Sequence, residues 1–319
     1  MAAERTNVTV MSAGSASALR VSVIVPVRNG RGDLMRLIDA LSRQTLPRGS
    51  FEVVIGDDGS TDGSTEGLAT DDGWIRVEPG PPMNSYGARN RAARASRASV
   101  LAFCDADCLP EPEWLERGLS ALESTDLAAG RIRFDVSDPR TVWTLLDMEA
   151  AKDHEREVER GTAETANLFL RRELYDRVGG FDDSIPEHGD FDFVQRCVAA
   201  GAVLSYAPEA IVWHPTRDRA KPFLRAIWIY NRWYAAREAR AGRTPEGLRL
   251  RSWVPLVQPI RARRRWRLSF GPDRRWLGAN GVSPNRREFM LALPLIYVFL
   301  PYYSGVAQAR GWFDGRRLR

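Results

Sequence analysis

The sequence predicts a doubly wound α/β domain followed by a helical tail that is rich in arginine and aromatic residues. Apolar runs of β-branched residues, which are typical of buried parallel strands, alternate with helical segments over the first 125 residues. Two of these runs, residues 53–55 and 100–103, end abruptly in carboxylates. Such strand ends lie in the crevice where open α/β sheets bind ligands. After Pro215 the composition shifts to Arg, Trp and Tyr, which predicts the tail.

The first half of the domain is predicted from simple periodicities. Apolar runs predict the strands, and Leu34, Leu37, Ile38 and Leu41 have the spacing of a helix. Glycine-rich residues 59–63 indicate a turn that opens a short helix. We expect strands over residues 21–27, 51–55, 74–77 and 99–103, with further helices over 86–96 and from Pro110 onward.

The second half is predicted to be a mixture of both element types. We expect strands over 128–134, 164–170 and 202–206, a polar helix over 142–159 on which His154 is solvated, and a helix over 190–200. The predicted organisation is therefore a disordered leader (1–20), two halves of one domain (21–125 and 126–214) and the tail (215–319).

Composition and charge limit the classes of partner. The chain has 319 residues, 44% hydrophobic and 27% charged, which is ordinary for a folded soluble protein, and a net charge of +5. Arginine clusters such as residues 261–267 fit nucleic acid, an anionic membrane or simply a solvated face. The neighbouring tryptophans favour the membrane, so we expect no nucleic acid partner. Cys104 and Cys108 are predicted to be small buried thiols, because three cysteines make no disulfide framework.

A short acidic motif, Asp105-Ala106-Asp107, follows one of the predicted strands. Divalent cations such as Mg²⁺ are held by one or two carboxylates together with substrate phosphates. A metal held there could neutralise a departing diphosphate. On its own, the motif is better explained as a strand terminator. If this strand end converges with the one that carries Asp57 and Asp58, the two indicate a site for a nucleoside diphosphate and a divalent metal.

The order of the motifs then decides the interpretation. The chain resembles the family 2 glycosyltransferases with the GT-A fold over roughly residues 21–214. This resemblance implies a GT-A-type, Rossmann-like domain whose residues 21–125 bind a nucleotide-sugar and whose residues 126–214 bind the acceptor and hold the catalytic base. The motifs that carry it occupy residues 23–30, 54–65, 87–90, 101–107, 178–182 and 189–196.

The family's donor and metal positions transfer residue by residue. A carboxylate at Asp57 or Asp58 could accept from a base imide or a ribose hydroxyl, and the Arg89 guanidinium suits a phosphate. The metal, Mn²⁺ or Mg²⁺, is expected on Asp105, Asp107 and His214. The expected contacts to the donor nucleotide come from Pro26, Val27, Arg28, Asp57, Asp58, Arg89, Asp105 and Ala106.

The same resemblance assigns the catalytic base to Asp190. The family usually has Glu-Asp at this turn, whereas this chain has Gly189-Asp190, which puts the support of the aspartate in question. The expected acceptor residues are Thr165, Asn167 and His188.

The implied activity is an inverting transfer of a sugar from a nucleotide-diphospho-sugar to an acceptor hydroxyl. A catalytically impaired nucleotide-binding scaffold is the first alternative, and the missing acid at Gly189 is its support. A nucleotidyltransferase is the second, but residues 26–30 lack the glycine-rich phosphate loop with which such enzymes usually open.

The tail suggests a place of action. Residues 289–307 approach the ~20 residues that span a bilayer, but Pro294 and Pro301 and the basic flanks favour an interfacial or re-entrant segment over a single membrane span. Aromatic and arginine residues over 223–234 fit an interfacial helix. We therefore expect a cytoplasmic enzyme, peripheral at the inner face of the cell membrane, with a lipid-linked or cell-envelope glycan as acceptor. Ordinary packing of both segments on the domain is the alternative.

Overall fold

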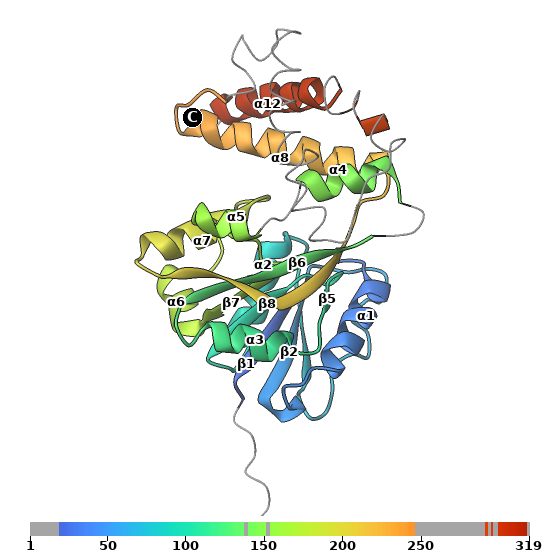
Figure 1. Ribbon diagram of the computed structural model, residues 1–319, viewed down its shortest axis with the longest axis vertical. Helices are drawn as coiled ribbons and strands as arrows, with labels where there is room; N and C mark the ends of the chain where they lie inside the picture. Colours follow the sequence, from blue (N-terminus) through green and yellow to red (C-terminus); the bar gives the residue numbers. More distant parts are fainter. Residues whose placement is uncertain are drawn as a thin grey trace, which may run out of the picture.

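One eight-stranded mixed sheet forms the centre of the molecule (Figure 1). The computed structural model describes residues 19–136, 140–150, 154–245, 291–292, 295 and 299–317. The strand order is β3-β2-β1-β4-β7-β6-β8-β5. The strands are β1 (Val21–Val27), β2 (Phe51–Asp57), β3 (Ile75–Pro79), β4 (Val100–Cys104), β5 (Leu109–Pro110), β6 (Leu127–Asp135), β7 (Asn167–Arg171) and β8 (Leu204–Pro215).

Helices cover both faces of the sheet, because each strand has apolar side chains on two sides (Figure 1). α1 and α3 lie on one face, and α2, α6 and α7 lie on the other. The helices are α1 (Arg31–Ser42), the 3₁₀ turn η1 (Arg48–Ser50), α2 (Ser85–Ala95), α3 (Trp114–Ala121), α4 (Val142–Ala150), α5 (His154–Glu159), α6 (Arg172–Val178), α7 (Gly189–Ala199), α8 (Ala220–Arg240) and α12 (Leu300–Arg317).

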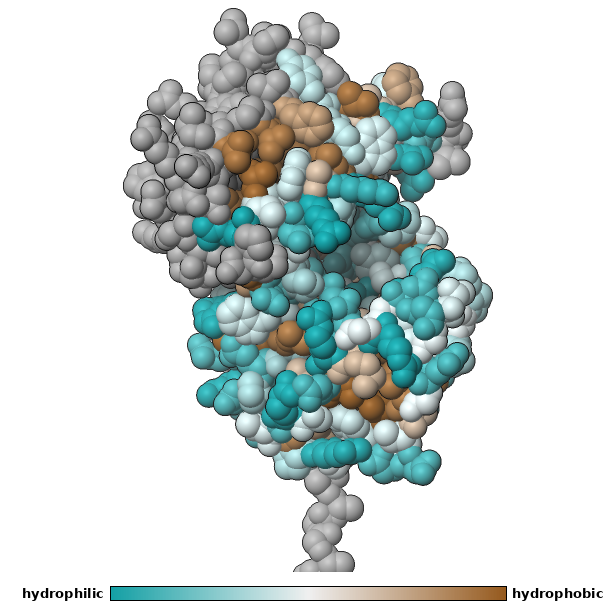
Figure 2. Space-filling model, turned by 90° about the vertical axis from the view of Figure 1, so that its right-hand side faces the viewer, coloured by the Kyte–Doolittle hydropathy of each residue, from teal (hydrophilic) through white to brown (hydrophobic). Residues whose placement is uncertain are grey.

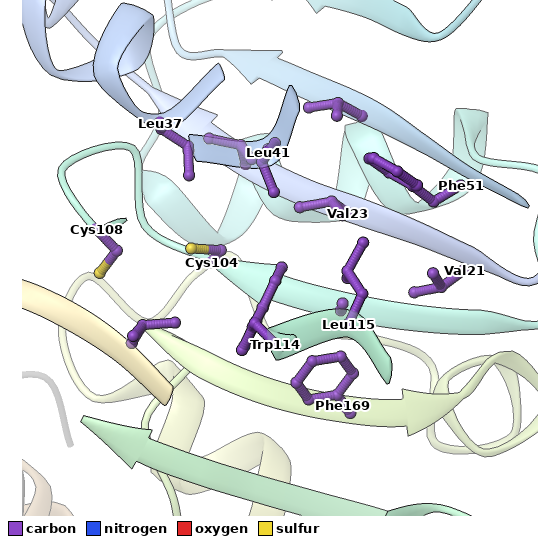
Figure 3. Close-up of a cluster of buried hydrophobic side chains, with 14 of the residues drawn as sticks. Val21, Val23, Leu37, Leu41, Phe51, Cys104, Cys108, Trp114, Leu115 and Phe169 are labelled. Atoms are coloured by element: carbon purple, nitrogen blue, oxygen red, sulfur yellow. The ribbon is translucent and has the colours of Figure 1, made fainter. Parts of the chain in front are cut away.

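Each face has its own apolar core. Alternate residues of β1 divide between them: Val23 and Val25 join the α1/α3 core, whereas Ile24 joins the α2/α6/α7 core. Figure 3 shows the first of these cores, in which Trp114 packs on Phe169 with ring centroids 5.0 Å apart. These two cores fix the strands, and so fix the positions of the loops that follow them.

The strand directions bring one set of loops together. β1, β2 and β4 are mutually parallel, and β7 is antiparallel to both β4 and β6, so β6 and β8 run in the same direction as β4. The carboxyl ends of β2, β4 and β8 therefore all lie at one edge of the sheet.

The tail forms a pair of helices beyond this edge, in which α8 and α12 lie side by side (Figure 1). They pack closely: a Cβ added to Gly311 would lie 1.8 Å from the carbonyl oxygen of Arg232. Arg232 also pairs with Asp314, with Nη2 and Oδ2 2.8 Å apart. Among the described helices, none is long and apolar enough to cross a bilayer.

The doubly wound α/β prediction is confirmed, with local corrections. The helix expected over 142–159 is present as α4 and α5, with residues 151–153 outside the described part. The strand expected over 202–206 is the longer β8, and the short helix expected after residue 63 is a turn closed by Glu66 N–H on Gly63 O. Much of the apolar run at 289–307 lies outside the described residues.

His154 also departs from expectation, because its side chain is buried rather than solvated. Its Nε2 accepts from the Glu164 N–H at 2.9 Å, which leaves Nδ1 to donate to the Gly130 carbonyl at 2.7 Å. The polar residues around His154 suggest a solvated helix, because the adjacent helical residues face water. The histidine itself faces β6, where it bonds the backbone.

Candidate active site

Four potential metal ligands from β4 and β8 meet at the edge of the sheet. Asp105, Asp107 and Cys108 lie on the loop that follows β4, and His214 is the penultimate residue of β8. One ligand atom from each of the four lies within 4.8 Å of the others. The three residues predicted to hold a metal are thus brought together, 107 positions apart between Asp107 and His214. Ala106, between the carboxylates, packs partly buried against the α1/α3 core.

The orientation of His214 suits a ligand. Its Nδ1 lies 2.7 Å from the Pro215 carbonyl oxygen, and its Nε2 lies 3.9 Å from Asp107 Oδ1. A hydrogen bond from one ring nitrogen to a backbone carbonyl fixes the tautomer in which the other nitrogen is the one that can bind a metal. His214 is therefore held with Nε2 toward the acidic loop.

The donor set fits Mn²⁺ or Mg²⁺. Two carboxylates and one imidazole are the oxygen and nitrogen ligands that these ions accept. Cys108 is a less suitable ligand, because the Cys104 thiol, burial and nearby carboxylates raise its pKa well above the usual value and keep the proton on sulfur. The residues present thus favour a hard divalent cation over a thiolate-bound one.

The predicted nucleotide residues at the end of β2 have unequal roles. Asp57 accepts from the Ser60 N–H at 2.8 Å and from the Thr65 hydroxyl at 2.6 Å. Burial would raise the pKa of Asp57, but these hydrogen bonds outweigh it and lower the pKa. Asp58 accepts from the Met83 N–H at 2.8 Å and lies 3.9 Å from Arg28. Asp57 therefore holds its own loop, while Asp58 and Arg28 face each other.

The end of β1 contacts the loop that follows β2. Pro26 and Val27 are buried, and Val27 is part of the α1/α3 core. The Val27 carbonyl accepts from the Asp58 N–H at 2.9 Å. These two buried residues thus anchor the start of the loop that carries Asp58.

Arg89 of α2 lies between Asp105, on the loop after β4 that we call the metal loop, and Tyr86. It is only 4% exposed, and its Nη2 pairs with Asp105 Oδ1. Its buried Nε has no hydrogen-bond partner among the described residues. Burying an unsatisfied donor is costly, so the site is suited to an anionic ligand that would bind this guanidinium.

Asp190, the predicted base, is the second residue of α7. Its Oδ1 accepts from the Phe191 N–H at 3.0 Å and from the Tyr86 hydroxyl at 3.4 Å. Burial raises the pKa of Asp190 most, and Glu164 raises it further, against the opposing charges of His188 and Arg89. A more basic carboxylate is better matched to removing a proton near neutral pH.

His188 links this turn to the tail. Its backbone is left-handed, with φ of 60°, and its ring contacts Tyr230 and Trp233 of α8 at centroid distances of 4.5 and 5.4 Å. Burial lowers the pKa of His188, the charge of Asp190 opposes this shift, and Arg237 lowers the pKa further. The tail thus packs directly on the residue two before the base.

The other two predicted acceptor residues are enclosed. Asn167 is fully buried; its Nδ2 donates to the carbonyls of Arg131 and Ala210 at 2.9 Å, and its Oδ1 accepts from Trp114 Nε1 at 2.8 Å. Thr165 is 2% exposed. Asn167 therefore ties β7, β6, β8 and α3 together.

Sequence reasoning missed several residues that surround Asp190. Glu164 raises the pKa of Asp190, and burial followed by the charge of Asp190 raises the pKa of both Tyr86 and Glu187. Tyr86 precedes Arg89 by one helical turn, which places both on one face of α2 and could have indicated it. No local pattern marks Glu164 or Glu187.

Comparison with known proteins agrees with this geometry. Residues 22–181 match the family described as "Glycosyl transferase family 2". Glycosyltransferase AglE of Haloferax volcanii is 34% identical over 205 residues, which cover 62% of this chain and 67% of that protein. Pre-mycofactocin glycosyltransferase of Mycobacterium tuberculosis is 29% identical over 225 residues, 66% of this chain and 46% of that protein.

The fold has solved counterparts. The mannosyltransferase PcManGT from Pyrobaculum calidifontis, solved in complex with GDP-Man and Mn²⁺, superposes with a TM-score of 0.59 at 18% identity. The match covers 92% of this chain and 87% of that one. At this identity the likeness speaks for the fold alone.

Proposed function

We propose a donor, a metal and a mechanism for this chain, which belongs to glycosyl transferase family 2, has the GT-A fold and is a glycosyltransferase. In our proposal it moves a sugar from a nucleotide-diphospho-sugar to an acceptor hydroxyl, with inversion at the anomeric carbon. One observation carries this proposal: Arg89 pairs with Asp105 of the metal loop and lies beside Tyr86, which donates to Asp190. Donor side and base therefore share one edge of the sheet.

Asp105, Asp107 and His214 would hold Mn²⁺ or Mg²⁺. When bound, the ion offsets the negative charge that grows on the departing diphosphate. PcManGT was solved with GDP-Man and Mn²⁺, which supports the same classes of donor and metal here. Arg89 adds a fixed positive charge beside this loop, and such a guanidinium suits a phosphate.

Asp190 acts as the general base in this proposal. Its carboxylate accepts the proton of the acceptor hydroxyl as the oxygen attacks the anomeric carbon opposite the diphosphate. One in-line displacement inverts that carbon. Its raised pKa keeps the carboxylate basic enough for this step, and Asp58 with Arg28 would bind the nucleoside end.

The proposed acceptor is a lipid-linked or cell-envelope glycan at the inner face of the membrane. Phe299, Val306 and Phe313 recur every seven residues and are 42%, 49% and 61% exposed. Arg310 is exposed beside them. Figure 2 shows hydrophobic surface gathered over the tail end of the molecule. An apolar stripe with arginines is suited to the surface of an anionic bilayer.

Thermal unfolding tests the donor site. The full chain is heated with UDP, GDP and their sugars, with and without Mn²⁺, as wild type, Asp107→Asn and Asp39→Asn. We expect one nucleotide to raise Tm, and only with Mn²⁺. At a hundredfold excess over Kd, its binding should add about 2.7 kcal/mol to the free energy of unfolding. Asp107→Asn should lose this gain, while Asp39→Asn, on the exposed side of α1, keeps it. No gain with any nucleotide would contradict the proposed donor site.

Liposome co-sedimentation tests the membrane proposal. Wild type should pellet with anionic vesicles and remain free of neutral ones, and Phe299→Ser with Phe313→Ser should abolish pelleting. Met35→Ser is the matched control, because Met35 is an equally exposed apolar residue (43%) on α1. Wild type that ignores anionic vesicles refutes the membrane proposal and leaves the transferase proposal standing.

A further inference from the structure

The space beside Gly189 is filled by an aromatic ring. A Cβ added at Gly189 would lie 2.9 Å from Cδ2 and Cε2 of Tyr86, closer than carbon atoms pack. Gly189 does not have a positive φ, so its backbone would accept other residues. The ring therefore explains why glycine stands where the resemblance implies an acid.

The same ring is connected to the base. The Tyr86 hydroxyl donates to Asp190 Oδ1 over 3.4 Å, between residues 104 positions apart. This distance is long, but catalytic hydrogen bonds often tighten when substrate binds. Burial, and then the charge of Asp190, raise the pKa of Tyr86 far above its usual value, so the hydroxyl keeps its proton to donate.

Tyr86 is itself firmly placed. It is 7% exposed, and its ring packs against Phe181 at a centroid distance of 5.7 Å. The Arg89 guanidinium lies 5.5 Å from the ring centroid. At the start of α2, Asn84 Oδ1 accepts from the Tyr86 N–H at 3.0 Å, which caps the helix. Helix, ring and hydroxyl form one rigid support.

We propose that Tyr86 is the positioning residue for Asp190, taking the place of the acidic side chain that Gly189 lacks. The hydroxyl orients the carboxylate toward the acceptor, and Gly189 provides the room for the ring. This inference rests on the proposed role of Asp190 as base, and it makes the glycine a sign of substitution rather than of lost activity.

The hydrogen bond should also tune the base. Other charged or titratable groups that act on Asp190 are Glu164, Glu187, His188 and Arg89, and all are left in place by Tyr86→Phe. Because the hydroxyl donates to the carboxylate, its removal disfavours the ionised form. The Asp190 titration should then move to higher pH.

Nuclear magnetic resonance can follow this titration without any substrate. The full chain, with ¹³C-labelled aspartate, is titrated as wild type and as Tyr86→Phe, with Asp190→Asn to assign the signal. We expect the Asp190 titration to have a higher midpoint pH in Tyr86→Phe than in wild type. In a separate activity assay with the nucleotide-sugar selected by thermal unfolding, Tyr86→Phe should release nucleoside diphosphate about tenfold more slowly. Tyr175→Phe is the control, because Tyr175 donates to Asn90 at 2.6 Å, not to Asp190. An unchanged midpoint in Tyr86→Phe overturns the proposal.

A second experiment tests the shared space by stability alone. Gly189→Ala should lower Tm by several degrees in wild type, because the new methyl group meets the Tyr86 ring, and by much less in a Tyr86→Ala background. Equal losses in both backgrounds would show that ring and glycine are not coupled.

Nucleotide binding separates this inference from the proposed function. Tyr86→Phe should bind UDP or GDP with Mn²⁺ as wild type does, since Tyr86 acts through Asp190. If neither protein binds a nucleotide, the proposed function fails, while the titration and the Tm comparison still decide the role of Tyr86.

Discussion

Two carboxylates at the same edge of the sheet, Asp57 and Asp190, have pKa values that are shifted in opposite directions. Hydrogen bonds from Thr65 and Ser60 overcome burial and lower the pKa of Asp57, whereas burial and Glu164 raise the pKa of Asp190. Asp57 is held by its own turn, within eight residues. Asp190 accepts from the adjacent Phe191 N–H and from Tyr86, which is 104 positions away. A carboxylate fixed in its charged form stabilises a loop, whereas one kept basic can accept a proton.

The largest effect should come from the base itself. Asp190→Asn removes the proton acceptor, and turnover should fall by about 10²–10⁴-fold while metal-dependent nucleotide binding is kept. Asp192→Asn, on the same helix and paired with Arg196 at 2.8 Å, is the matched control and should retain turnover. The readout is release of nucleoside diphosphate from the nucleotide-sugar found by thermal shift. Normal turnover in Asp190→Asn removes it from the base role.

The next effect is on stability. Asn167→Ala deletes three buried hydrogen bonds and leaves backbone carbonyls unpaired, so unfolding should become easier by about 3–4 kcal/mol. Urea unfolding measures this. A variant of normal stability that fails to transfer sugar would instead support the predicted acceptor role of Asn167.

The opposite pKa shifts of Asp57 and Asp190 predict opposite dependences of stability on pH. The folded pKa of Asp57 lies below 3.8, so its contribution is present above that pH and is lost as pH falls. The folded pKa of Asp190 lies above 3.8, so its contribution is present below that pH and is lost as pH rises.

At neutral pH, therefore, Asp57→Asn should destabilise the fold by about 1–2 kcal/mol, whereas Asp190→Asn should raise Tm. The Asp190→Asn difference should shrink as pH falls toward about 4, whereas the Asp57→Asn difference should shrink only at lower pH, because the folded pKa of Asp57 is lowered. Thermal unfolding over this range measures them, and shifts of the same sign for both variants would contradict the comparison.

The smallest effect should come from the tail. Trp233→Ala removes a ring that packs on His188, and we expect turnover to fall about fivefold with nucleotide binding unchanged. Trp312→Ala on α12 is the control, because that ring contacts Phe313 and Arg316 instead. Loss of nucleotide binding in Trp233→Ala would mean that the tail supports the donor half as well.

The same contrast explains what could be predicted from the sequence. The donor half was readable because apolar strand, turn and carboxylate follow one another locally, as in residues 53–60. The region around Asp190 was readable only through resemblance. Tyr86, Glu164 and His154 act across sheet partners and helix faces far apart in the chain, and no local pattern records which of them meet.

Asn167 shows the same limit from the other side. The resemblance predicts a contact between Asn167 and an acceptor, whereas its buried hydrogen bonds, which local sequence does not reveal, tie the sheet to α3. His214 is expected at the metal through the resemblance alone, and the structure places it near the end of β8, which runs parallel to β6. Strand ends can thus be inferred from sequence, whereas side-chain partners across the fold cannot.

The central claim is that donor binding and base chemistry occupy neighbouring but separate parts of one edge. Electron paramagnetic resonance of Mn²⁺ tests it most directly, because the signal of the free ion falls as it binds. The titration compares wild type, Asp107→Asn and Asp190→Asn in the presence of the nucleoside diphosphate selected by thermal shift. We predict wild-type binding in Asp190→Asn and lost binding in Asp107→Asn. Equal loss in both variants would place Asp190 in the metal site and contradict the account.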